Sequence, residues 1–92
     1  MEHRIVAAAC RSKYVILVGV RHWDDIMHLQ HDALAPMVAV KKVLYEQGFI
    51  DNHRQFINRQ EAWKVAEAAG QILRRVGGDE SKGGTLYSEN LY

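Results

Sequence analysis

The stretch QGFIDNHRQFINRQEAWKVAEAAGQI, residues Gln47–Ile72, decides the fold because it joins a short apolar hairpin to a strongly patterned helix. Phe49–Ile50 predicts a strand that returns over residues 55–57, and the polar residues between the two have turn chemistry. Asn58 then suits a helix N-cap, and Glu61 follows it at the spacing of a capping box.

The helix that begins at this cap is expected to continue to the glycines at 77 and 78. Its apolar side chains recur at spacings of three and four residues: Ala62, Val65, Ala66, Ala69, Ile72, Leu73 and Val76. Gly70 lies inside this pattern, where glycine costs about 1 kcal/mol relative to alanine. We expect close packing at Gly70, with the approach of a ligand to the backbone as the alternative.

Two apolar runs nearer the N-terminus, Ile5–Cys10 and Tyr14–Val20, are separated by three polar residues and predict an antiparallel β-hairpin. Because both runs are continuously apolar, we expect helices to cover one face and another subunit to cover the other. The pair Asp24–Asp25 then begins a predicted helix that ends before Pro36. Residues 37–46 favour either a helix of about three turns or a strand.

The expected architecture is therefore a small single α+β domain over residues 1–92, with an N-terminal antiparallel β-hairpin packed by two or three helices. The segment GGDESKGG, residues 77–84, is typical of a flexible linker. Residues 85–92 are expected to dock on their own domain or on a neighbouring subunit, because large apolar side chains at a chain end rarely remain in water.

Composition restricts the function classes. Twelve Lys and Arg against eleven Asp and Glu give a formal net charge of +1, which excludes the global basic field that drives binding to DNA or RNA polymers. The single cysteine cannot form an internal disulfide, and this favours a reducing, cytoplasmic setting. No secretory signal pattern and no apolar run of about 20 residues is present, so we expect no membrane association.

Several catalytic and metal patterns are weak. His28 and His31 lie one helical turn apart, but a structural zinc site requires four ligands and the chain has no cysteine pair, so we expect neither a metal nor another cofactor. Cys10 lies in an apolar run and is interpreted as a buried thiol. Turn formation accounts for Asp51 and helix capping for Glu61, which leaves no carboxylate pair for acid–base catalysis and predicts a protein that is not an enzyme.

Arginine is the more informative residue type. Arg21, Arg54 and Arg59 can bind phosphate oxygens in bidentate fashion, and Phe56 offers a flat face for a base. The helix that follows Asn58 directs free N–H groups and its positive dipole end toward the same turn. A second interpretation stays open, in which the arginines form a solvated rim and Phe56 with the two tryptophans packs in a core or interface.

The pattern QGF-turn-RQFINRQEAWKVAEAAGQI, followed by a spacer and LYSENLY, resembles a layout of small phage-encoded proteins, GF…RFVxRxEAxxIAxxxGQ…LxSEDLY. The opening segment IVAAACRSKYVILVGVRHWDDIM is similar to the hairpin and GxRHxDxI segment of the same group. The group looks most like the Thoeris anti-defence sponges, oligomeric phage proteins that sequester the cyclic ADP-ribose signal of a bacterial TIR enzyme. Some of them also hold cyclic oligonucleotides.

This resemblance implies a homo-oligomer in the cytoplasm of the host bacterial cell that binds a cyclic nucleotide without cleaving it. The motif positions implied in ligand contact are Arg21, His22, Phe56, Arg59 and Gln71, and the arginine-rich turn adds Arg54. The chain departs from the layout in having Asn90 where an aspartate is expected and in its longer glycine-rich spacer. The main rival is a phage protein that inhibits a host protein by direct contact; a small nucleotide-modifying enzyme is a third hypothesis.

Overall fold

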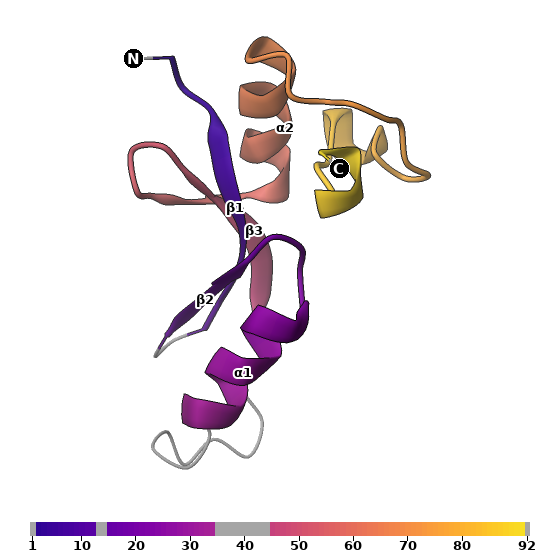
Figure 1. The fold of residues 1–92 in the computed structure, drawn as a ribbon. Coiled ribbons are helices and arrows are strands. Elements are labelled where there is room, and N and C mark those ends of the chain that lie inside the picture. The colour runs from indigo at the N-terminus through magenta and orange to yellow at the C-terminus, as the bar shows by residue number, and fades with distance from the viewer. Residues whose placement is uncertain (1, 13–14, 35–44, 92) are drawn as a thin grey trace.

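The computed structural model describes residues 2–12, 15–34 and 45–91, which form a four-stranded antiparallel sheet with two α-helices. In chain order the elements are β1 (Ile5–Arg11), β2 (Ile16–Gly19), α1 (Asp25–Leu34), β3 (Glu46–Asp51), β4 (Phe56–Asn58) and α2 (Arg59–Ala68). The strand order is β2-β1-β3-β4, so the two predicted hairpins join side by side through β1 and β3 (Figure 1). The α+β class and the single domain are confirmed.

The predicted element over residues 37–46 lies almost wholly outside the described residues, and its last residue, Glu46, begins β3. The helix predicted from Asp24–Asp25 is confirmed as α1, which begins at Asp25. Asp24 accepts hydrogen bonds from the N–H groups of Val20 and Met27 at 2.8 and 2.9 Å, and so fixes the turn between β2 and α1.

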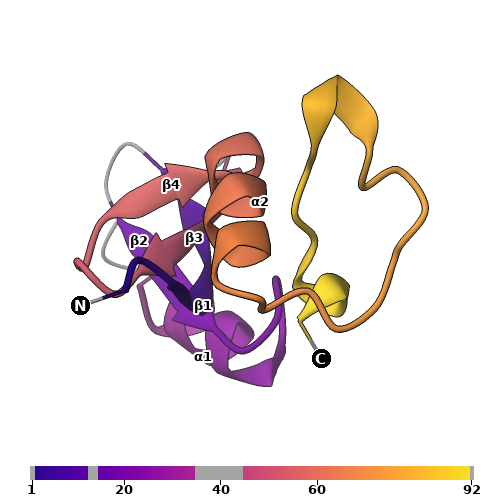
Figure 2. The same cartoon turned by 90° about the horizontal axis from the view of Figure 1, so that it is seen from above.

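Both helices pack on one face of the sheet. Against α2, the main core joins Ile5, Ala8, Phe49, Ile57, Ala62, Trp63, Ala66, Leu86 and Leu91. Against α1, a smaller cluster joins Cys10, Leu17 and Met27. Figure 2 shows α2 between the sheet and the C-terminal segment. The small alanine side chains of β1 let the strand lie close to the helices without overcrowding the core.

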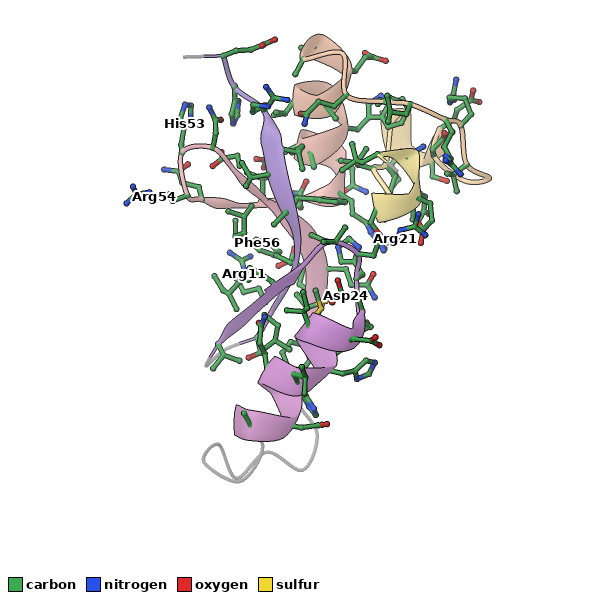
Figure 3. All side chains as sticks on the ribbon, viewed as in Figure 1. Arg11, Arg21, Asp24, His53, Arg54 and Phe56 are labelled. Carbon is green, nitrogen blue, oxygen red and sulfur yellow. The ribbon has the colours of Figure 1, made fainter. Side chains whose placement is uncertain are left out.

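The opposite face of the sheet, called here the open face, carries Arg11, Ile16, Val18 and Phe56. Side chains alternate along a strand, so Ile16 and Val18 point away from buried Leu17, and they are 46% and 38% exposed. The guanidinium of Arg11 lies 4.2 Å from the ring centroid of Phe56 and pairs with the carboxylate of Glu46 at 2.7 Å (Figure 3). Within the described residues no helix covers this face.

The outer edge of β2 is bonded to a side chain of α1. Gln30 Nε2 donates to the carbonyl oxygen of Val18 at 2.7 Å, and Gln30 Oε1 accepts from the N–H of Val18 at 2.9 Å. These two bonds hold α1 against β2 and satisfy backbone groups that an edge strand otherwise leaves to water.

The α2 helix begins as predicted but ends earlier. Asn58 Oδ1 accepts from the N–H of Glu61 at 2.8 Å, which confirms the N-cap. The helix ends at Ala68, so the predicted continuation to the glycines at 77 and 78 is wrong. Gly70 adopts a φ of +68°, its N–H bonds Glu67, and the N–H of Gln71 bonds Ala66 at 2.8 Å. These bonds form a Schellman motif, a common helix terminator that favours glycine.

Gly70 therefore has a different role from the one expected. A Cβ atom placed there would meet no heavy atom within 4 Å, which contradicts close packing at this position. The left-handed backbone is the reason for the glycine. Leu73, which fits the helical spacing in the sequence, lies beyond the helix and is 71% exposed.

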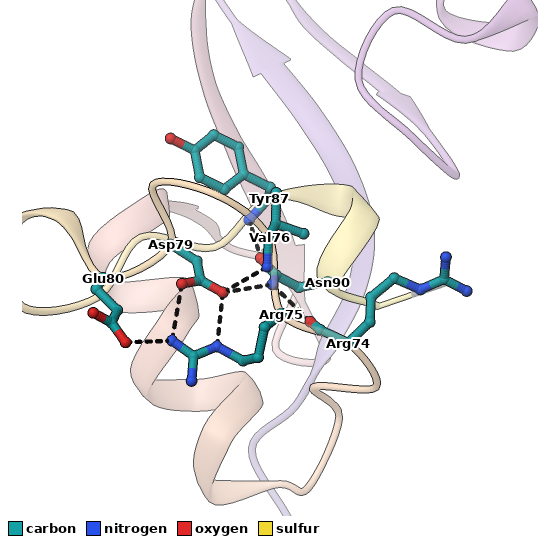
Figure 4. A network of polar contacts seen from close by, with 7 residues as sticks. All are labelled: Arg74, Arg75, Val76, Asp79, Glu80, Tyr87 and Asn90. Carbon is teal, nitrogen blue, oxygen red and sulfur yellow. Dashed lines mark hydrogen bonds and ion pairs between the residues drawn. The ribbon is translucent and has the colours of Figure 1, made fainter.

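The segment at 77–84, expected to be a flexible linker, contains buried polar contacts (Figure 4). Asp79 accepts from Arg75 Nε at 2.8 Å, from the N–H of Val76 at 2.9 Å and from Asn90 Nδ2 at 3.2 Å. The Arg75 guanidinium beside Asp79 holds the pKa of that carboxyl far below its usual range. The same segment brings Gly84 against the Trp63 ring, where a Cβ would approach Cδ1 to 2.2 Å.

Candidate functional site

Arg59 is the first residue of α2, and its half-buried guanidinium lies among neutral groups. Its Nη2 donates a short hydrogen bond to Gln47 Oε1, and its planar head lies 4.8 Å from the ring centroid of Tyr87. The buried Nε has no hydrogen-bond partner, and no carboxylate among the described residues forms an ion pair with Arg59. A partly buried charge without a counter-charge is energetically costly and suits an anion.

His22 lies in the same region and connects three segments of the chain. Its Nε2 lies 2.7 Å from the carbonyl oxygen of Gly48 and therefore donates, which leaves Nδ1 to accept from the hydroxyl of Ser88 at 3.3 Å. The ring also packs edge-to-face on Phe49 at 4.9 Å between centroids. Both ring nitrogens thus already have partners within the chain.

Burial and the charge of Arg59 shift the pKa values of two nearby side chains, His22 and Cys10. Burial, with a contribution from the charge of Arg59, lowers the pKa of His22, although the hydrogen bond to Gly48 acts in the opposite direction. Burial likewise raises the pKa of Cys10 to about 11 against the opposing charge of Arg59. Cys10 is fully buried, as expected, and a protonated thiol at neutral pH is a poor nucleophile.

Arg54 and Phe56 lie elsewhere. Arg54 is exposed in the turn between β3 and β4 with a φ of +64°, and Phe56 lies on the open face beneath the Arg11 guanidinium. Figure 3 shows both on one side of the sheet, with Arg21 on the other side near the C-terminal segment. These residues therefore do not form the single arginine-rich surface that the sequence predicts.

Gln71 is bonded to the first strand. Its Oε1 accepts from the N–H of Ile5 at 2.7 Å, and its Nε2 donates to the carbonyl oxygen of Ile5 at 2.9 Å. Its amide is thus occupied within the chain, and the structure gives it a part in the fold that the sequence did not reveal.

Of the six predicted ligand residues, the structure brings Arg59 and His22 into one region, where Arg59 bonds Gln47 and His22 bonds the adjacent Gly48. Sequence reasoning missed Gln47, Tyr87 and Ser88 as neighbours of this pair. The LYSEN segment, residues 86–90, is the signal that could have drawn attention to the last two, but its distance along the chain conceals the contact. We call Arg59, Gln47 and Tyr87 the Arg59 cluster.

The histidines of α1 do not gather metal ligands. Their rings pack near Trp23, at 5.5 Å for His28 and 5.8 Å for His31 between centroids. Within residues 2–12, 15–34 and 45–91, the group of three potential metal ligands that does form is His3, Asp51 and His53. In the same described part of the chain, no helix has the length and apolar character required to cross a bilayer.

Comparison with known proteins places the chain in a family. No curated protein and no solved structure matches it significantly. A family model described as phage T4 y16D protein matches residues 4–92, which includes both hairpins, both helices and the C-terminal segment. The chain therefore belongs to the phage T4 y16D protein family.

Proposed function

We propose that this phage protein binds and sequesters a cyclic nucleotide immune signal without cleaving it, with cyclic ADP-ribose as the first ligand type and cyclic oligonucleotides as the second. The observation that carries the proposal is the half-buried Arg59 guanidinium, which has no carboxylate partner among the described residues. The resemblance of the sequence motifs to the anti-defence sponges supplies the ligand class.

The chemistry of the Arg59 cluster suits a phosphate group. A guanidinium presents a planar fork of donors that matches two phosphate oxygens, and Arg59 lies at the positive end of the α2 dipole. Tyr87 orients this fork by stacking beneath it at 4.8 Å. Gln47 is a neutral partner that a phosphate oxygen can replace at modest cost.

The nearby titratable groups favour retention of the ligand over its cleavage. His22 uses both ring nitrogens within the chain, and the raised pKa of Cys10 keeps its thiol protonated. Neither group is prepared to act as a general base or nucleophile toward a ligand bound at Arg59.

The proposal includes a homo-oligomer that buries the open face. Ile16 and Val18 lie on this face and are substantially exposed, as expected if a second copy supplies their cover. Substituting Val18 with Asp should convert the oligomer into a monomer in light scattering coupled to size exclusion. A wild-type protein that is already monomeric at high concentration would contradict this part of the proposal.

The ligand test uses native mass spectrometry and calorimetry with a panel of cyclic ADP-ribose isomers and cyclic di- and trinucleotides. We expect an unaltered ligand after heat release, and Arg59→Ala should weaken binding by about 10- to 100-fold, the usual range for losing a charge-assisted bond. Arg54→Ala is the matched control, because Arg54 lies in the exposed turn between β3 and β4 and takes no part in the Arg59 cluster. Equal affinities of Arg59→Ala and wild type, or a chemically altered ligand, would reject the proposal.

Inhibition of a host protein by direct contact is the second candidate, favoured by the exposed Ile16 and Val18 of the open face. In that case Val18→Asp should abolish binding to a purified host partner. The nucleotide panel should then leave both wild type and Arg59→Ala unliganded.

A further inference from the structure

Two histidines and an aspartate that do not belong to the Arg59 cluster meet at the end of the sheet. One potential ligand atom from each of His3, Asp51 and His53 lies within 4.8 Å of the others. His3 Nε2 is 2.8 Å from Asp51 Oδ2, and the two imidazole rings stack with centroids 4.8 Å apart and planes 12° from parallel.

The carboxylate of Asp51 is held rigidly. Its side chain is 2% exposed, and its Oδ1 accepts from the N–H groups of His53 and Gln55, each at 2.9 Å. Oδ2 therefore points toward the histidines from a fixed position. Metal-ligating carboxylates are commonly held in this way by hydrogen bonds to their second oxygen.

We propose that His3, Asp51 and His53 form a binding site for a divalent transition metal ion of the zinc class. Two imidazole nitrogens and one carboxylate oxygen are ligands typical of zinc, and water completes the tetrahedron in such three-ligand sites. Ligand atoms around tetrahedral zinc are about 3.4 Å apart at the usual bond lengths. The ion would replace the 2.8 Å hydrogen bond between His3 and Asp51, and the exposed His3 and His53 side chains can rotate out of their stack to reach the ligand spacing.

The ion would tie the N-terminal strand to the β3–β4 turn. His3 precedes β1, whereas Asp51 ends β3 and His53 lies in the following turn. Existing bonds already align these segments, because Asn52 accepts from the N–H of Arg4 at 3.0 Å and donates to the carbonyl oxygen of Glu2 at 2.7 Å. A bound metal would thus stabilise the folded chain, as metals do in other small domains.

The test is calorimetric titration of tag-free protein with zinc chloride in a non-chelating buffer, with native mass spectrometry for stoichiometry. We expect one ion per chain, and about a hundredfold weaker binding or worse in His53→Ala and in Asp51→Asn. Asparagine keeps the oxygen that accepts from His53 and Gln55, so Asp51→Asn tests the ligand with the turn preserved. His28→Ala and His31→Ala are the matched controls and should bind zinc as wild type does.

A second measurement is independent of affinity. Zinc should raise the melting temperature of wild type in proportion to the logarithm of its concentration, and it should leave that of His53→Ala unchanged. The proposal is overturned if wild type binds no stoichiometric zinc, if His53→Ala retains wild-type affinity, or if His31→Ala loses it. Because Arg59 takes no part, the result is independent of nucleotide binding.

Discussion

The side-chain amide of Gln71 bonds both backbone groups of Ile5, accepting at 2.7 Å and donating at 2.9 Å. Gln71 follows the glycine that ends α2, and Ile5 begins β1, so this pair of bonds fastens the end of the helix to the first strand. Ile5 is 5% exposed, and water cannot readily replace the amide.

We predict that Gln71→Ala lowers the free energy of unfolding by about 2–3 kcal/mol, since two bonds to a buried backbone are lost. Chemical denaturation measures this change. Gln60→Ala is the control, because Gln60 makes a single 3.3 Å bond to the hydroxyl of Thr85 and should cost less than about 1 kcal/mol. If the two variants lose the same free energy of unfolding, the Gln71 bonds do not stabilise the fold more than the single Gln60 bond does.

Gly70→Ala gives the second prediction, and its sign distinguishes the observed helix end from a continuous helix. At a φ of +68°, alanine should destabilise the protein by about 1 kcal/mol, whereas in a helix interior it would stabilise by a similar amount. Gly77→Ala is the control, since Gly77 has no positive φ and a Cβ there meets nothing within 4 Å. A rise in melting temperature for Gly70→Ala would be incompatible with the Schellman motif.

The third prediction concerns the departure from the SED pattern. Asn90 is fully buried, and its Nδ2 donates to the carbonyl oxygen of Arg74 at 2.9 Å and to the Asp79 carboxylate at 3.2 Å. Asn90→Asp replaces the donating amide with a carboxylate oxygen that faces the Arg74 carbonyl oxygen and the Asp79 carboxylate. This substitution should therefore lower the melting temperature more than Asn90→Ala does. Thermal unfolding of both variants checks the order, and the reverse order would contradict the role of Asn90 as a donor.

The fourth prediction is a dependence of stability on pH. Because the pKa of His22 is lowered in the folded state, the unfolded chain binds this proton first, near pH ~6.5. The contribution of neutral His22 is therefore complete above that pH and is lost as the pH falls through the lower, folded-state value. Denaturation curves at pH 7.5 and 5.5 should differ more for wild type than for His22→Gln.

The carboxylates of Asp24 and Asp51 affect stability in a different, more acidic pH range. The lowered pKa values of Asp24 and Asp51 mean that their contributions persist above the unfolded value near pH ~4 and are lost only below it. If the free energy of unfolding depends on pH in the same way for wild type and His22→Gln above pH 5, then His22 does not cause that dependence.

The secondary structure near Asn58 was predictable because its signals are local. The cap is a contact between residues three apart, and both hairpins join runs that lie next to each other in the chain. The end of α2 was not predictable from periodicity, since apolar Ile72 and Leu73 continue the helical spacing. The deciding feature is the backbone of Gly70, and glycine inside an apolar pattern has several meanings.

The candidate site was only partly predictable. Arg59 could be singled out from its place at a helix N-terminus, but its neighbour Tyr87 arrives through the packing of the C-terminal segment. Phe56 and Arg59 are close in sequence, yet strand alternation places Phe56 on the open face while Arg59 bonds Gln47. Likewise, His3 and His53 are 50 positions apart, and only the sheet register brings them together.

The bonds between Gln30 and Val18 have a consequence for how copies of this chain can aggregate. They occupy both backbone hydrogen-bonding groups of Val18 and obstruct strand addition at the outer edge of β2. Growth of an intermolecular β-sheet, the usual route from an edge strand to a fibril, would first have to displace a helix side chain there. Stacking of the open faces of two copies, as proposed above, would not require this edge and would not lead to growth of a continuous β-sheet.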